Sequence, residues 1–207
     1  MSKKVLYVTG TPLPTGVSRS KEVAEVFINA YKKANPSDII IEKDLFASWI
    51  PYIDGELLSG WKKQENGEVP TEAEASKLAA YAASTEEFLT ADKIIIQSSM
   101  WNLSIATQLK GYLDTLVVAG KTFSYTENGP KGLMKGKKAI HFHGAGGVYS
   151  DTVGVEHSDS FVTGILKFIG IEVLPTIWVE GIDSNPDRKD EIMQAAFEKA
   201  KKAAMIF

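Results

Sequence analysis

The N-terminal part of the chain contains the apolar run KVLYVT (residues 4–9), a loop with two glycines and two prolines, and the segment GVSRS (residues 16–20). The run is short and almost wholly apolar, which is typical of a strand buried on both faces of a parallel sheet. Behind the loop, apolar residues recur at the spacing of one helical face: Val23, Val26, Phe27, Ala30 and Tyr31. This stretch therefore predicts a strand, a loop and a helix that begins at about Ser18.

The same alternation of strand and helix continues to the end of the chain. Apolar runs predict strands at Lys93–Ser98, Lys138–His143 and Ile171–Trp178, and alternating apolar and polar residues predict an edge-like strand at Asp38–Lys43. Helical patterns predict a short helix at Glu56–Gly60 and longer ones at Thr71–Leu89, Ser104–Val118, Glu156–Gly170 and Pro186–Met205. Turn residues predict a hairpin-like excursion at Thr122–Leu133.

Five strands separated by helices favour right-handed parallel crossovers and a three-layer α/β fold. We expect one domain over residues 1–207, with a doubly wound, five-stranded parallel sheet of order 2-1-3-4-5, the flavodoxin-like arrangement. In such a sheet, ligands bind beyond the carboxyl ends of the strands. The loops after the first, third and fourth strands should meet there.

Composition excludes several classes of function. The 207 residues carry a net charge of −3, without the surplus of Lys and Arg that nucleic-acid binding needs, so we expect no nucleic-acid partner. The absence of cysteine excludes disulfides, thiolate catalysis and Cys-ligated zinc or iron–sulfur sites. No window reaches the roughly 18 apolar residues of a membrane span, and no signal sequence is apparent. We expect a cytoplasmic protein with no membrane association.

The first loop ends in Ser18-Arg19-Ser20 at the start of a helix. Free amides at a helix N-terminus and serine hydroxyls suit a phosphate, although a plain N-cap explains the serines equally well. Neither a GxGxxG nor a Walker A pattern is present.

The second loop contains Met100-Trp101-Asn102-Leu103. A thioether, an indole and an amide suit a flat aromatic ligand, but Met100 and Trp101 on their own read more simply as core.

The third loop, Gly144-Ala145-Gly146-Gly147, lets backbone amides approach a ligand, or simply makes a tight exit from the strand. His141 and His143 precede it and point to the same face of a strand. Packed or hydrogen-bonded histidines are the simpler interpretation, because no third metal ligand is evident; we expect no metal. A serine hydrolase has little support, since no Gly-x-Ser-x-Gly surrounds Ser98 or Ser99.

Several segments together resemble one family, the bacterial FMN-dependent NADH azoreductases, which also reduce quinones. The resemblance covers essentially the whole chain, and its most specific piece is Tyr125-Thr126-Glu127-Asn128-Gly129-Pro130. Other matching segments are Ser18-Arg19-Ser20, Met100–Ser104, Thr107–Lys110, Gly146-Gly147 and Phe168–Ile171. The family often has Tyr and Phe where Trp101 and Leu103 stand, and Ser-Arg where Gly144-Ala145 stand.

The resemblance implies a role for each loop. Ser18, Arg19 and Ser20 would hold the phosphate of a tightly bound FMN. Met100, Trp101, Asn102 and Leu103 would line its ring and ribityl chain, and Gly144, Ala145, Gly146 and Gly147 would reach its pyrimidine edge. The family forms homodimers with each flavin at the interface, so Tyr125 and Phe168 would wall the substrate pocket, Phe168 from the partner subunit.

The resemblance also implies the reaction. NADH would pass hydride to flavin N5 and a quinone or azo compound would then accept it from the same place, which gives ping-pong kinetics and needs no catalytic side chain. Redox chemistry without cysteine or metal does need an organic cofactor. The alternative is a flavodoxin-type electron-transfer protein, although this chain is only mildly acidic for such a shuttle.

Overall fold

The centre of the computed structural model, which describes residues 2–152 and 154–207, is a parallel sheet of order β2-β1-β3-β6-β7, with β8 also paired to β6. This is the predicted doubly wound order. Its strands are β1 (Lys4–Gly10), β2 (Ile39–Asp44), β3 (Lys93–Ser99), β6 (Lys138–Gly144), β7 (Glu172–Val173) and β8 (Ile177–Val179).

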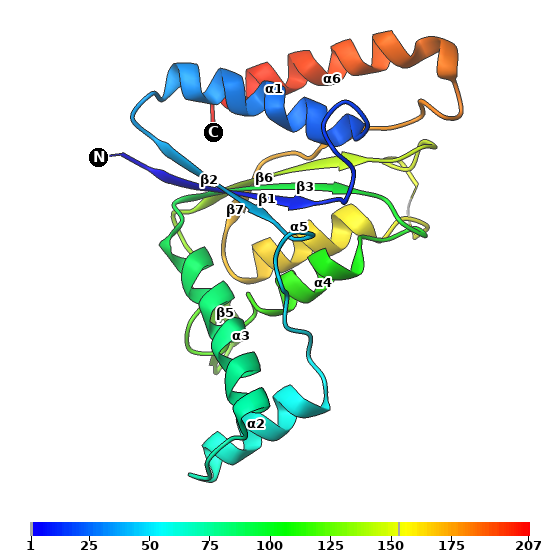
Figure 1. Cartoon of the computed structure of the whole chain (residues 1–207). Helices are drawn as coiled ribbons and strands as arrows, with labels where there is room; N and C mark the ends of the chain where they lie inside the picture. Colours follow the sequence, from blue (N-terminus) through cyan, green and yellow to red (C-terminus); the bar gives the residue numbers. More distant parts are fainter. Residues whose placement is uncertain (1, 153) are drawn as a thin grey trace.

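Helices cover both faces of the sheet (Figure 1). One face carries α1 (Arg19–Ala34) and α6 (Lys189–Ala204), which follows the short 3-10 helix η1 (Pro186–Arg188). The other carries α3 (Glu72–Thr90), α4 (Thr107–Asp114) and α5 (Ser158–Phe168), while α2 (Gly55–Glu65) packs at the far end of α3.

The middle strands are buried on both faces because their side chains alternate between two cores. Val5 and Tyr7 of β1 pack with α1 and α6, whereas Leu6 and Val8 pack toward α4 and α5. The expected edge position of β2 is confirmed, and its partly exposed, charged half fits that position. The middle of the sheet therefore holds its carboxyl-end loops on a rigid base.

The predicted last strand, Ile171–Trp178, is wrong in detail because it is split into β7 and β8. Pro175 lies between the two pieces and has no N–H to donate to a ladder, so pairing with β6 stops at Val173 and resumes at Ile177.

Three helices also differ from the prediction. The α2 helix is longer than Glu56–Gly60, and Asp54 caps its N-terminus. The α4 helix covers only the middle of Ser104–Val118, because Ser104 pairs with Trp101 instead. The α5 helix starts at Ser158 rather than Glu156, whose carboxylate accepts hydrogen bonds from the first amides of the helix.

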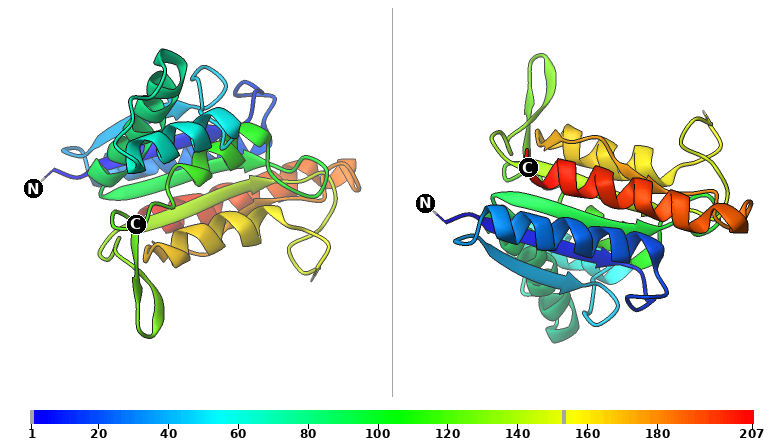
Figure 2. Two further views of the ribbon diagram at one scale, coloured as in Figure 1. Left: turned by 90° about the horizontal axis from the view of Figure 1, so that it is seen from below. Right: turned by 90° about the horizontal axis from the view of Figure 1, so that it is seen from above.

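The predicted capping box of α3 is confirmed: Thr71 and Glu74 satisfy each other's backbone amides. The predicted excursion is an antiparallel hairpin of β4 (Phe123–Thr126) and β5 (Gly129–Gly132). Figure 2 shows this hairpin projecting at the end of the molecule where both chain termini lie. No helix among the described residues is long and apolar enough to cross a membrane.

Candidate functional site

The three predicted loops converge on one pocket of about 300 Å³ at the carboxyl ends of β1, β3 and β6. Eight of the predicted site residues line it: Ser18, Arg19, Ser20, Met100, Trp101, Gly144, Ala145 and Gly146. Asn102, Leu103 and Gly147 lie beside the pocket in the same loops. Leu13, Val17, Ser99, Val179 and Asp183 complete the lining and were not predicted.

The N-terminus of α1 forms the polar end of the pocket. Ser18 is the N-cap, and its side chain accepts a bond from the Lys21 amide. The first amides of a helix have no intrahelical acceptor, and together with the helix dipole they favour an anion. Ser18 is therefore the N-cap of α1 and also lines the pocket.

The two serines are not equivalent. The Ser20 hydroxyl donates its only hydrogen to the Ser98 carbonyl at 2.8 Å and accepts from Gln97 Nε2 at 2.8 Å. The Ser18 hydroxyl makes only long contacts of 3.4–3.5 Å. Ser18 is thus the better placed hydroxyl donor toward the pocket, and Ser20 ties α1 to the end of β3.

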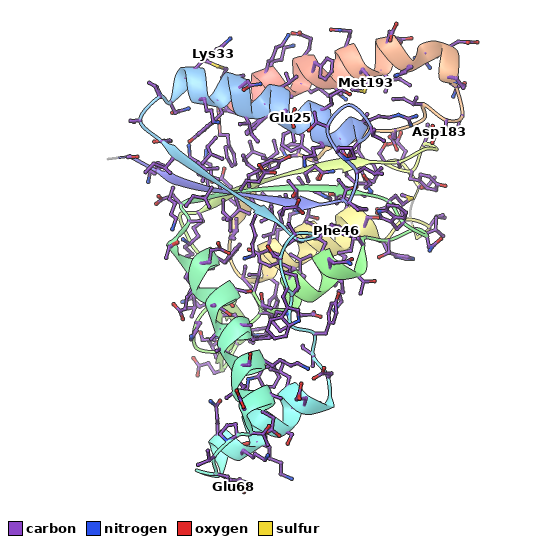
Figure 3. The ribbon with its side chains drawn as sticks, in the orientation of Figure 1. Glu25, Lys33, Phe46, Glu68, Asp183 and Met193 are labelled. Carbon is purple, nitrogen blue, oxygen red and sulfur yellow. The ribbon has the colours of Figure 1, made fainter. Side chains whose placement is uncertain are left out.

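An ion pair crosses the mouth of the polar end. Arg19 Nη2 lies 2.7 Å from Asp183 Oδ1, and Asp183 comes from the loop between β8 and α6. Figure 3 shows Asp183 at the end of the molecule where the site loops lie. This fourth loop was missed, although the rule that ligands bind at the carboxyl ends of strands applies to β8 as well.

The second loop is a strained turn. Trp101 and Ser104 exchange both backbone hydrogen bonds, at 2.7 and 3.0 Å, so Asn102 and Leu103 form the two-residue tip. Both tip residues are left-handed, with φ of 49° and 65°. Trp101 is 44% exposed and Leu103 41%, so the simpler reading of Trp101 as core is wrong. Strained backbone of this kind is typical of binding sites.

The third loop approaches its neighbours as closely as backbone allows. A Cβ on Gly144 would lie 3.0 Å from the Ser20 hydroxyl, and one on Gly146 would lie 2.4 Å from the Asp183 carboxylate. The loop is held by backbone bonds from Met100 to Gly144 and from Gly181 to Gly147. Gly144 and Gly146 thus lie close to the side chains of Ser20 and Asp183, so the third loop packs against two other loops of the site.

His141 and His143 do share one face of β6, as predicted, and both contact Ser98. Ser98 Oγ lies 2.8 Å from His141 Nε2 and 2.7 Å from His143 Nδ1. His141 Nδ1 lies 2.8 Å from Asp159 Oδ1 of α5, which also accepts a bond from Thr176. The chain Ser98–His141–Asp159 has the geometry of a hydrolase triad. Ser98 is fully buried, however, so it cannot reach a substrate.

Burial sets the charge of this group. Burial, with the neighbouring His141 as a smaller cause, lowers the pKa of His143 to about 3. Burial alone would raise the pKa of Asp159, but hydrogen bonds from His141 and Thr176 leave it below its usual value. A neutral His143 thus faces a charged Asp159 through Ser98 and His141. Among the described residues, no group of three His, Cys, Asp or Glu side chains could hold a metal ion.

Tyr125 and Phe168 lie far from the three loops within one chain. Tyr125 is on the β4–β5 hairpin and Phe168 ends α5, and both pack against Phe123. The hairpin lies toward the amino ends of the parallel strands (Figure 2), whereas the pocket lies at their carboxyl ends. Tyr125 is 77% exposed and Phe168 40%. The two residues form an exposed aromatic surface over the buried Phe123, and this chain's own pocket does not use that surface.

A larger cavity of about 610 Å³ lies between α2, α3 and residues 117–121. The residues that line it are mainly alanines and other apolar side chains, such as Trp61, Leu78 and Val117. It has no counterpart to the helix amides, hydroxyls and glycine-rich backbone of the smaller pocket. The smaller pocket is therefore the candidate site.

The chain is similar to known proteins over nearly its whole length. The family described as flavodoxin-like fold matches residues 3–204. The chain is 46% identical over 209 residues to FMN-dependent NADH:quinone oxidoreductase 2 of Listeria innocua, with 99% of both chains covered. It is 36% identical to the crystal structure of an azoreductase from Bacillus anthracis, with a TM-score of 0.92 over the whole of both chains. An FMN-dependent NADH-azoreductase from the same species, solved in complex with FMN, has a TM-score of 0.91 at 28% identity and 97% coverage of both chains.

Proposed function

We propose that this chain, which belongs to the flavodoxin-like family of FMN-dependent NADH:quinone oxidoreductases, binds FMN and uses NADH to reduce quinones and azo compounds. The observation that carries the proposal is the convergence of three loops on one pocket, with an anion-binding end and an aromatic end. The similarity to the relatives extends over 99% of the chain, so it includes all three loops.

The polar end fits a phosphate group. Ser18 and the first amides of α1 supply neutral donors, and the Arg19 guanidinium supplies a positive charge beside them. Arg19 is held at this position by Asp183. We propose that Ser18, Arg19 and Ser20 hold the FMN phosphate, with Ser18 as a direct donor and Ser20 as the anchor of the helix.

The other end fits a flat ring. Met100 and Trp101 offer a thioether and an exposed indole, and the turn presents Asn102 and Leu103 beside them. The close packing of Gly144 and Gly146 keeps side chains out of the space in front of the third loop. We propose that these residues, with Ala145 and Gly147, surround the isoalloxazine.

Bound FMN would supply a hydride acceptor at N5 that NADH reduces and that a quinone or azo compound reoxidises in a second, ping-pong half-reaction. The chain itself would bind the FMN, orient its ring and shield it from water. Backbone amides of the glycine-rich loop can stabilise negative charge, and no side chain needs to act as a general base. The buried Ser98 group lies behind the loops and takes no direct part.

We further propose a homodimer in the cytoplasm. The pocket of one chain lacks the aromatic wall that Tyr125 and Phe168 would provide, because both pack against Phe123 of the hairpin and neither lines the pocket. A second copy could bring its own aromatic surface to the pocket. Light scattering of the purified protein should give twice the chain mass of 22.6 kDa, and a monomer that turns over at full rate would contradict this arrangement.

The decisive experiment is a visible spectrum of the protein with added FMN, before and after anaerobic NADH. We expect flavin to stay with the protein through gel filtration, and its absorption at about 450 nm to bleach with NADH and return with menadione. Loss of all flavin on filtration would refute the cofactor. Retained flavin that NADH does not reduce would favour an electron-transfer protein of the flavodoxin type instead.

A further inference from the structure

A buried row of polar side chains lies directly behind the candidate site. Asp159, His141, Ser98 and His143 are joined in that order by contacts of 2.8, 2.8 and 2.7 Å. Ser98 and both histidines are fully buried. None of these side chains lines the pocket, and the proposed reaction does not use them.

If each imidazole carries a single hydrogen, the hydrogens of this row can be arranged in only one way. The Asp159 carboxylate can only accept, so His141 Nδ1 must carry a hydrogen and His141 Nε2 must accept from the Ser98 hydroxyl. Ser98 has one hydrogen, which is then used, so it must accept from His143 Nδ1. Both histidines are therefore Nδ1–H tautomers.

The remaining atom of the row agrees with this arrangement. His143 Nε2 is buried without a hydrogen-bond partner. In the arrangement above it is a bare nitrogen. If His141 carried a second hydrogen, Ser98 would have to donate to His143, and Nε2 would become a buried N–H with no acceptor, which is costly.

Ser98 also connects the loops of the site. Its backbone carbonyl accepts the hydroxyl of Ser20 at the start of α1. Its side chain fixes the ring of His143, the residue immediately before Gly144, and the Gly144 carbonyl in turn accepts the amide of Met100 at 2.7 Å. Three loops from three separate strands thus meet at this one buried serine.

We infer that Ser98 is a positioning residue of the site, which holds the α1 start and the glycine-rich loop in register through Ser20 and His143, with His141 and Asp159 fixing the direction of its hydrogen. This inference rests on the proposed FMN binding, because it assigns Ser98 to the geometry of that site. Its spectroscopic part does not depend on FMN.

The first test is imidazole ¹⁵N nuclear magnetic resonance of the full chain near neutral pH, with FMN and without it. We expect His141 and His143 to show the neutral Nδ1–H pattern, which is the minor tautomer of free imidazole side chains. An Nε2–H pattern for either histidine would overturn the hydrogen arrangement. In Ser98→Ala, the pattern of His143 should change, because its Nδ1 loses its acceptor.

The second test measures FMN affinity by fluorescence quenching. Ser98→Ala and His143→Phe should each weaken FMN binding by about tenfold, which is the effect of one ordinary hydrogen bond. Because both changes break the same contact, the affinity of the double variant should equal that of the single variant that binds FMN less tightly. His143→Phe keeps a buried ring and removes the unpaired Nε2, so it serves if Ser98→Ala fails to fold.

Ser158→Ala is the matched control. Ser158 lies on the neighbouring α5, and its buried hydroxyl has no hydrogen-bond partner, so this variant should bind FMN like the unaltered chain. Unchanged affinity in both site variants would overturn the positioning role. If the unaltered chain itself fails to bind FMN, the proposed function is refuted. The resonance measurement still tests the hydrogen arrangement around Ser98, because it does not require FMN.

Discussion

At the scale of single residues, the candidate site combines strain with buried hydrogen bonds. Asn102 and Leu103 are adjacent left-handed residues without being glycine. Asparagine tolerates this conformation, whereas leucine has no local hydrogen bond to offset it. The turn persists because Trp101 and Ser104 close it with two backbone bonds. The tip is therefore held in place at a cost of about 1–3 kcal/mol.

Replacing Leu103 by glycine should relieve part of this strain. The leucine side chain is already 41% exposed, so little burial is lost, and we expect Leu103→Gly to raise the free energy of unfolding by about 1 kcal/mol. FMN affinity should fall, because the side chain beside the ring is lost. Urea unfolding and an FMN titration measure the two effects. Leu103→Ala is the control: it loses the same contacts and keeps the strained Cβ, so its stability should not rise.

The serines at the start of α1 allow a direct test of the phosphate end. Ser18→Ala together with Ser20→Ala should weaken FMN binding by at least the roughly 1.5–3 kcal/mol of one charge-assisted bond. Ser18 is lost as a direct donor to the phosphate, and Ser20 is lost as the anchor of α1 to the Ser98 carbonyl. The fold should persist, as judged by circular dichroism. Ser84→Ala, a buried serine on α3 away from the pocket, should leave affinity unchanged. Equal affinity in the double variant would mean that the phosphate lies elsewhere.

At the scale of elements, the β4–β5 hairpin is held by backbone packing against the end of α5. Gly132 meets Gly170 so closely that a Cβ on Gly132 would lie 2.3 Å from the Gly170 nitrogen. The amide of Met134 also bonds to the carbonyl of Ile169 at 2.8 Å. These contacts fix the hairpin and bring Tyr125 beside Phe168 around Phe123.

Gly132→Ala should destabilise the protein by about 1–3 kcal/mol, because backbone rather than a flexible side chain would have to move. Urea unfolding measures the loss. Gly164→Ala is the matched control on an open face of α5, where a Cβ meets nothing within 4 Å, and it should stabilise the protein by about 0.5–1 kcal/mol. A Gly132 variant as stable as the unaltered chain would show that the hairpin is not anchored there.

The sequence predicts these elements best where a pattern is local. The buried runs of β1, β3 and β6 and the capping box of α3 depend on neighbours in the chain, and all were found. The start of α4 was missed because Ser104 turns back to Trp101, a contact that no periodicity reveals. The break at Pro175 could have been found, since proline rarely lies within a ladder.

The site was predictable for a related reason. A parallel sheet brings its carboxyl-end loops together whatever their sequences, so Ser18, Met100 and Gly144 could be placed near one another in advance. Partners that come from distant segments could not. Asp183 reaches Arg19 across 164 positions, and Asp159 reaches His141 from a different element.

At the scale of the whole molecule, the buried His143 makes stability depend on pH. Its pKa is about 3 in the folded chain and close to 6.5 when unfolded, so in that interval the unfolded chain binds more protons. The contribution of neutral His143 to the free energy of unfolding should therefore be fully present above about pH 6.5. It should fall as the pH is lowered below that value, by up to about 1.4 kcal/mol per pH unit.

Urea unfolding at several pH values between about 7 and 4 measures this dependence. His143→Phe should flatten the profile over that range, because the group that binds the proton on unfolding is gone. Asp159 changes stability in the same direction, but only at lower pH, since its carboxyl titrates below its usual pKa. An identical slope in the variant would assign the dependence to other groups.

The interrupted last strand has a consequence for how copies of this chain can meet. On this margin of the sheet, β7 has two residues and β8 has three, and Pro175 lies between them. The margin therefore presents no continuous row of free amides and carbonyls. The opposite margin, β2, ends in the charged residues Glu42, Lys43 and Asp44. Neither margin is suited to recruit a strand from another molecule, which protects the sheet from fibrous growth. Association between copies must then depend on side chains and loops rather than on a shared, extended sheet.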